Sequence, residues 1–201
     1  MATYNKKGHI HGKFDQTRWN TYDGIGRNNA KEFWEQKGWD IGDYDKSEDG
    51  DLRYDHTDLR ATKGKSELYV EAAVKRSDLW KYAKEGVDIE TRKLKYVKEG
   101  NKAVVNMSDE SGDQMMVIPM ECLKAAQDSC GDEFKGQGGV LTSDGFEMPD
   151  HGCHRVRKRC RKGVGQTGEP EDFYRIPYEY VAHYRKIGGK YEMIHKPTKK
   201  V

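Results

Sequence analysis

The chain has 201 residues, of which 34% are hydrophobic and 35% are charged, and its formal net charge at pH 7 is +2. This polar composition predicts one domain with a modest core and added segments. The near-neutral charge excludes polyanion binding by bulk electrostatics, so only a local cluster of bases can indicate such a partner. The sequence shows no apolar run as long as a membrane span and no signal-peptide core, so we expect a cytoplasmic protein without a membrane partner.

The first third of the chain predicts an arm, a helix and a strand. Residues 1–25, rich in Gly, Asn, His and Lys, are interpreted as an N-terminal arm that either packs on the domain or lies on nucleic acid. Asn28 or Asn29 can cap a helix that ends at Gly38. Alternating residues 39–44 then predict a strand.

An acidic segment, residues 45–56, follows and imitates a calcium-binding loop. Its last position is His56, where such a loop needs a bidentate Glu. We therefore favour a solvated acidic turn.

The most informative stretch is residues 54–76, which predicts a β-hairpin with its turn at Gly64-Lys65, because glycine readily adopts the positive φ of a tight turn. Centring the turn there places Asp58 directly opposite Glu71, with Lys75 farther along on the same face. Like charges that face each other cost stability, so this pair needs a cation or has a function. The other face is apolar and predicts a core: Leu59, Leu68, Val70, Ala72 and Val74.

The segment after the hairpin alternates between predicted helices and strands. We predict helices over residues 77–82, 88–97 and 120–129, and strands over 103–107, 114–118 and 173–176. A further helix over 178–185 would repeat a strand-Pro-helix unit. This order predicts an α/β fold with one mixed central sheet flanked by helices. Four bases lie in the predicted helix 88–97 or directly after it, and we interpret them as a solvated helix face. They are Arg92, Lys93, Lys95 and Lys98.

The Gly-rich segment from residue 131 to 170 is expected to be irregular, and it contains a dense basic run. Such a run suits phosphate contacts that hold a nucleic acid without reading its sequence, and a solvated loop is the equal alternative. The bases concerned are Arg155, Arg157, Lys158, Arg159, Arg161 and Lys162.

The four cysteines lie at positions 122, 130, 153 and 160, without the tight spacing of a zinc knuckle. A structural Zn²⁺ would be held by the His and Cys residues around the basic run, namely His151, Cys153, His154 and Cys160. We favour free thiols instead, with Cys122 buried in its helix.

Two carboxylates one strand spacing apart can share a divalent cation with a preference for oxygen ligands, Mg²⁺ or Mn²⁺. A bound metal lowers the pKa of water and offsets charge on a phosphorane-like transition state. A nearby lysine can orient the water or bind phosphate oxygens. This combination indicates a phosphodiesterase site.

Asp58, Glu71 and Lys75 on a hairpin, between a helix ending at Gly38 and a later helix and strand, resemble the PD-(D/E)XK nuclease superfamily over residues 26–120. The resemblance implies a restriction-endonuclease-like core in which the Asp and Glu bind metal and the Lys activates water. It also implies cleavage of DNA or, less often, RNA.

Two features depart from the family pattern. The family lysine lies two residues after the Glu, where this chain has Ala73, and His56 opposite it is a candidate auxiliary group. Many members also carry an acid early in the first helix, where this chain has residues 27–29, Arg-Asn-Asn.

We therefore predict an N-terminal arm (1–25), a nuclease-like α/β core (26–130) and an irregular basic C-terminal extension packed on the core (131–201). The predicted activity is Mg²⁺-dependent endonucleolytic cleavage, with double-stranded DNA as the expected partner. The alternatives are a non-catalytic nucleic-acid-binding or regulatory protein on the same fold and a zinc-stapled interaction module. Homodimer formation is left open.

Overall fold

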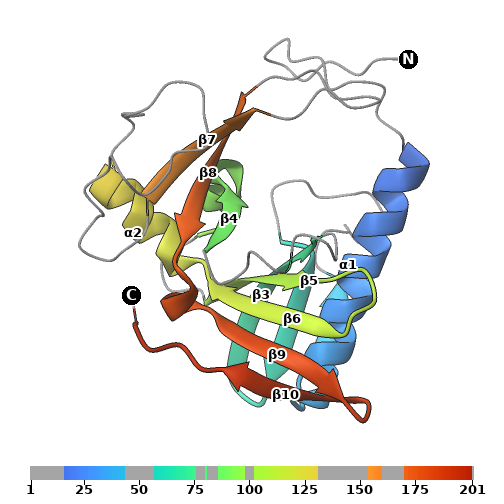
Figure 1. The fold of residues 1–201 in the computed structure, drawn as a ribbon. Coiled ribbons are helices and arrows are strands. Elements are labelled where there is room, and N and C mark those ends of the chain that lie inside the picture. The colour runs from blue at the N-terminus through green and yellow to red at the C-terminus, as the bar shows by residue number, and fades with distance from the viewer. Residues whose placement is uncertain are drawn as a thin grey trace.

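The computed structural model describes residues 16–43, 57–75, 80, 86–97, 102–130, 154–159 and 170–200. These residues form an α/β fold made of a curled mixed sheet, a smaller sheet and few helices (Figure 1). None of the described helices combines the length and the apolar character needed to cross a membrane.

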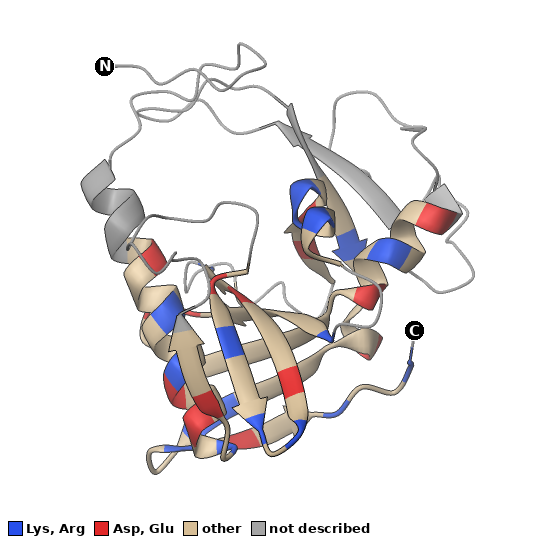
Figure 2. Ribbon diagram, turned by 180° about the vertical axis from the view of Figure 1, so that it is seen from behind, with Lys and Arg blue, Asp and Glu red and all other residues tan. Residues whose placement is uncertain are grey.

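The larger sheet has seven strands among the described residues. Its first three strands form an antiparallel meander, β5 joins β3 in parallel, and the last three strands add antiparallel. In spatial order the strands are β1 (Asp40–Asp43), β2 (Leu59–Lys63), β3 (Ser66–Val74), β5 (Ala103–Ser108), β6 (Gln114–Pro119), β9 (Ala182–Ile187) and β10 (Lys190–His195). Lys, Arg, Asp and Glu are interspersed over this sheet (Figure 2), in keeping with the near-neutral net charge.

The smaller described sheet consists of β4 (Val87–Glu90), β8 (Pro170–Ile176) and β7 (His154–Arg159), in that order. The 3-10 helix η2 (Thr91–Tyr96) follows β4, and helix α2 (Glu121–Cys130) lies beside β7 and β8 (Figure 1). Ile89 and Ile176 of this sheet share a core with Val105 and Met116 of the large sheet and with Leu123 of α2. The two sheets are thus joined through one hydrophobic cluster.

Helix α1 (Gln16–Gln36) begins well before the predicted cap, so residues 16–25 belong to a helix and not to an arm. Its end is as predicted. Gly38 has φ of +76°, and Gly38 and Trp39 donate their backbone N–H groups to the carbonyls of Glu35 and Trp34 at 2.9 and 3.0 Å. This is the Schellman arrangement, in which a left-handed glycine satisfies the last carbonyls of a helix.

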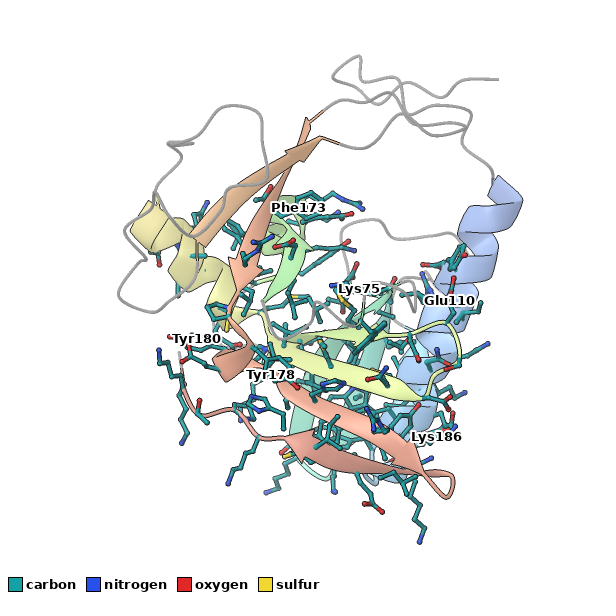
Figure 3. All side chains as sticks on the ribbon, viewed as in Figure 1. Lys75, Glu110, Phe173, Tyr178, Tyr180 and Lys186 are labelled. Carbon is teal, nitrogen blue, oxygen red and sulfur yellow. The ribbon has the colours of Figure 1, made fainter. Side chains whose placement is uncertain are left out.

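Helix α1 packs closely on β3 and on the turn after β5. A Cβ at Gly26 would lie 3.2 Å from the Val74 side chain, so this glycine permits the close approach. Asn29 does not cap the helix; its side-chain amide donates to Ser108 Oγ at 3.0 Å and to the carbonyl of Asp109 at 3.2 Å. Tyr22 donates to Glu110, which Figure 3 shows beside α1.

The predicted hairpin is confirmed where the structure describes it. β2 and β3 are antiparallel, with Leu59 opposite Val70 and Lys63 opposite Ser66, and Gly64 in the turn has φ of +59°. Its predicted core face is buried against α1, with Leu59 and Val70 in one apolar cluster with Ala30. The strands predicted at 39–44, 103–107 and 114–118, the turn between the last two and the helix at 120–129 are also present.

Three predicted elements are wrong. Residues 88–90, predicted as helix, continue strand β4, because Val87 and Ile89 alternate with Asp88 and Glu90 and point into the shared core. Residues 182–187, predicted as helix, form β9 after the short 3-10 helix η4 (Tyr178–Tyr180). Residues 154–159 of the basic run form β7 instead of a loop.

The strand-Pro-helix repeat does not exist, since β6 pairs with β9 while β8 lies in the other sheet. Strand β10, which the sequence did not predict, is an edge of the large sheet, and the end of α1 covers its backbone. The backbone N–H of Tyr191 donates to Gln36, and Lys37 donates to the carbonyl of Tyr191 at 2.9 Å. Covering an edge in this way prevents unwanted strand pairing.

We predict that Gly112→Ala destabilises the protein more than Gly188→Ala. Both glycines have positive φ, +75° and +55°, so each substitution carries the left-handed backbone cost of about 1–2 kcal/mol. A Cβ at Gly112 would also lie 2.7 Å from Asn29 Oδ1, whereas nothing lies within 4 Å of one at Gly188. Chemical denaturation should show a larger loss of unfolding free energy for Gly112→Ala than for Gly188→Ala. This difference should become smaller when Asn29 is also replaced by alanine. Equal losses for both variants would contradict the docking of α1 on this turn.

Candidate functional site

Asp58 and Glu71 come together as the hairpin predicts. The ladder that pairs Leu59 with Val70 continues by one step to place Asp58, just before β2, opposite Glu71 in β3. The Asp58 Oδ2 atom accepts a hydrogen bond of 2.7 Å from the backbone N–H of Ala72, so its side chain is fixed to the neighbouring strand.

The Glu71 side chain is buried and that of Asp58 is largely buried, and both carboxylates have raised pKa values. Loss of hydration, and then the negative charge of Glu71, raise the pKa of Asp58 to about 7, against the lowering influence of Arg27, the Ala72 N–H and Lys93. Glu71 is only 3% exposed, and burial raises its pKa although Lys93 lies beside it. Carboxylates with raised pKa values are typical of functional sites, because a purely structural ion pair is usually arranged to favour the charged form.

A lysine does reach the pair, but it is Lys93 of η2. Its Nζ atom contacts Glu71 Oε1. The other oxygen of this carboxylate, Oε2, is buried and has no hydrogen-bond partner among the described residues. Burying an unsatisfied carboxylate oxygen costs free energy, so this atom is a plausible ligand position for a cation.

An arginine lies on the opposite side of the pair. Arg27 of α1 donates from Nη2 to Asp58 Oδ1 at 3.0 Å and from Nε to Asp23 Oδ2 at 2.9 Å. Asp23 lies one turn earlier on the same helix. The sequence did not predict a role for this acid, because the cap expected at Asn28 or Asn29 places the start of the helix after Asp23, whereas α1 begins at Gln16.

Lys75, the lysine predicted for this site, follows the last residue of β3 (Figure 3). Its backbone N–H donates to the carbonyl of Ser108 at 2.8 Å, and its carbonyl accepts from the Trp80 indole at 3.0 Å. Among the described residues Glu71 forms an ion pair with Lys93, so the role expected for Lys75 has a second candidate. The role of Lys75 itself stays a prediction.

Several predicted site residues lie outside the described part of the chain. These are His56, His151, Cys153, Cys160, Arg161, Lys162 and the side chains of His154, Arg155, Arg157, Lys158 and Arg159. Cys122 is buried in α2, as expected. The zinc and calcium hypotheses thus stay untested.

The donor set fits Mg²⁺ or Mn²⁺. The described residues contain no cluster of three or more His, Cys, Asp or Glu side chains able to hold a metal ion. Asp58 and Glu71 offer two carboxylates, and Mg²⁺ is commonly held by one or two carboxylates together with water and substrate phosphate. The unpartnered Glu71 Oε2 supplies an open ligand atom.

We predict that the stability of the protein falls as the pH rises from about 4 to 7, by about 3 kcal/mol from Asp58. A raised pKa means that the folded protein holds this proton more tightly than the unfolded chain does, so the stabilisation is present at low pH and lost as Asp58 ionises. Glu71→Gln removes the repelling charge, so this variant should show a weaker pH dependence and at about pH 8 should be at least as stable as the wild type.

Urea denaturation across this pH range tests the prediction. Glu67→Gln is the matched control on the same strand; it removes a surface ion pair with Arg60 and should change stability by less than about 1 kcal/mol. If Glu71 served only as a structural partner of Lys93, Glu71→Gln would instead cost about 3–5 kcal/mol at neutral pH.

No protein-family model matches this chain, and no curated protein matches it. The chemistry of the site must therefore be inferred from its own residues. It contains two opposed, buried carboxylates, with Lys93 on one side and Arg27 on the other.

Proposed function

We propose that this protein is a Mg²⁺-dependent nuclease that hydrolyses phosphodiester bonds, with DNA as the preferred substrate. One observation carries the proposal: Asp58 and Glu71 are buried against each other with raised pKa values, although Arg27 and Lys93 already contact them. When both carboxylates are ionised, this arrangement lowers the stability of the folded protein. The cost has a physical reason if the negative charge serves to bind a divalent cation.

Each side chain of the site has a role in this proposal. Asp58 and Glu71 would hold the ion. Mg²⁺ at this place would act as a Lewis acid toward a phosphodiester oxygen and offset charge in the transition state. Lys93, held at Glu71 Oε1, is close enough to orient the attacking water or to bind a phosphate oxygen.

The topology supports the resemblance to the PD-(D/E)XK superfamily. Helix α1, the meander β1–β2–β3 and the parallel strand β5 follow one another in the order expected for such a core, and the two carboxylates lie on the second and third strands. Asp23 on α1 is a candidate for the acid that many members of the superfamily carry early in the first helix. The displaced lysine has a candidate in Lys93.

A nucleic-acid partner is supported by bases beside the carboxylates. Arg92 and Lys95 are exposed on η2, on either side of Lys93 in the sequence, so this segment is better placed for phosphate contacts than the solvated helix face we had expected. Contacts of this kind hold the backbone of a nucleic acid without reading its sequence. The basic run Arg155–Lys162 is proposed to extend this contact.

The alternative is a non-catalytic nucleic-acid binder on the same fold. Ala73, at the place where the resemblance implies a lysine, favours this alternative. It would bind duplexes in a salt-sensitive way without cleaving them.

Asp58→Asn is predicted to abolish Mg²⁺-dependent cleavage, with a loss of at least about 10³-fold, because one of the two metal ligands loses its charge. The assay would offer linear, circular, branched and single-stranded DNA, and RNA, with Mg²⁺ or EDTA. Lys31→Met, which removes an exposed lysine on α1, should cleave as the wild type does. Undiminished cleavage by Asp58→Asn would refute the assignment. Salt-sensitive binding by a wild type that cuts none of these substrates would favour the non-catalytic alternative.

Lys93→Met is predicted to lower the rate of cleavage by about 10²-fold, because positioning of the nucleophile by a side chain typically contributes this much. Lys75→Met is the matched comparison, since the sequence alone assigned this role to Lys75. A larger loss for Lys75→Met than for Lys93→Met would return the role to Lys75. Both rates should be measured at saturating Mg²⁺, so that a change in metal affinity is not mistaken for a change in rate.

A further inference from the structure

Arg27 already holds the carboxylate that the proposed metal would need. Its guanidinium bridges Asp58 Oδ1 at 3.0 Å and Asp23 Oδ2 at 2.9 Å. The side chain is only 18% exposed, so this bridge lies in a largely buried place. The positively charged guanidinium of Arg27 therefore lies at the candidate metal centre.

The four carboxylate oxygens of the pair are not equally available. Asp58 Oδ2 accepts the Ala72 N–H, Asp58 Oδ1 binds Arg27, and Glu71 Oε1 contacts Lys93. Only Glu71 Oε2 has no hydrogen-bond partner among the described residues. Glu71 Oε2 can bind a divalent ion without giving up a hydrogen bond, but for Asp58 Oδ1 to bind the same ion the guanidinium must be displaced, because two cations on one oxygen repel each other.

Asp23 gives the displaced arginine a second position. Asp23 and Arg27 lie four residues apart on α1, and their ion pair can persist while the guanidinium as a whole swings away from Asp58. A guanidinium that leaves one oxyanion prefers another, and phosphate accepts its forked donors well. The nucleic-acid backbone is the phosphate that would arrive at this site.

Resting on the proposed function, we propose that Arg27 is a displaceable counter-cation that makes metal binding depend on nucleic acid. In the free protein Arg27 neutralises Asp58 and weakens divalent-ion binding. A substrate phosphate draws the guanidinium off Asp58 while Asp23 retains it, and the ion then takes its place between Asp58 and Glu71. Because coupling between two ligands is reciprocal, the ion must also tighten the binding of nucleic acid.

The experiment measures Mn²⁺ binding to the full chain by calorimetry at about pH 8, with and without a short phosphorothioate DNA duplex, which keeps the phosphate charge and resists cleavage. Without DNA, Arg27→Met should bind Mn²⁺ about tenfold more tightly than the wild type. DNA should tighten Mn²⁺ binding by the wild type and leave the variant unchanged. Arg27→Lys, which keeps the charge, should stay close to the wild type.

Lys31→Met is the matched control, since it removes one positive charge from the same helix away from the pair. Arg27→Gln keeps hydrogen-bond donors and replaces Arg27→Met if that variant fails to fold. It should show the same increase in Mn²⁺ affinity. The inference is overturned if the folded neutral variants bind Mn²⁺ no more tightly than the wild type, or if Lys31→Met gains as much as they do. It is also overturned if DNA tightens binding equally in all proteins.

Asp58→Asn separates this inference from the proposed function. If Asp58→Asn abolishes Mn²⁺ binding but the neutral Arg27 variants match the wild type, the metal site stands and only the role of Arg27 is wrong. If Arg27→Met with Asp58→Asn binds Mn²⁺ as tightly as Arg27→Met alone, the ion lies elsewhere, and both the metal assignment and the role of Arg27 fail.

Discussion

The repulsion between Asp58 and Glu71 is the constraint on which the rest of the site depends. A β-ladder fixes the two carboxylates opposite each other, and neither can move away without breaking the register of the hairpin. Three described groups donate hydrogen bonds to them: the Ala72 amide from β3, Arg27 from α1 and Lys93 from η2. The helix and the 3-10 helix are thus held to the hairpin partly by the charges that it presents.

The direction of the pKa shifts shows that the cations do not fully compensate the two carboxylates. If Arg27 and Lys93 did so, the pKa values of Asp58 and Glu71 would fall below their ordinary range. They rise instead, because burial outweighs the cations at both groups and the charge of Glu71 adds to this effect at Asp58. Ionising the pair therefore costs stability, which is a recurrent property of functional sites.

The sequence predicts what is local and misses what is tertiary. The register of β2 and β3 follows from a glycine turn and an alternation of side chains, both within one short segment, and the structure confirms it. The start of α1 depends on contacts with β3 and with the turn after β5, which make Gly26 and Asn29 acceptable inside a helix. Strands β4 and β9 likewise depend on distant partners. Because the predicted helix started too late, Asp23 was not recognised as part of the site. Because residues 88–97 were predicted to be a solvated helix, Lys93 was not expected to contact Glu71.

Packing between the two sheets bears on position 73, where the resemblance to the PD-(D/E)XK superfamily implies a lysine and this chain has alanine. Ala73 packs against the hydrophobic cluster shared by the two sheets, as do Leu94 and Tyr96 of η2. A lysine at position 73 would have to place its amino group against this apolar cluster, at a high desolvation cost. The η2 segment, which packs on the same cluster, also brings Lys93 to Glu71 from outside the hairpin. Under the proposed function, the absence of a lysine at position 73 and the presence of Lys93 at the site are therefore two consequences of one packing arrangement.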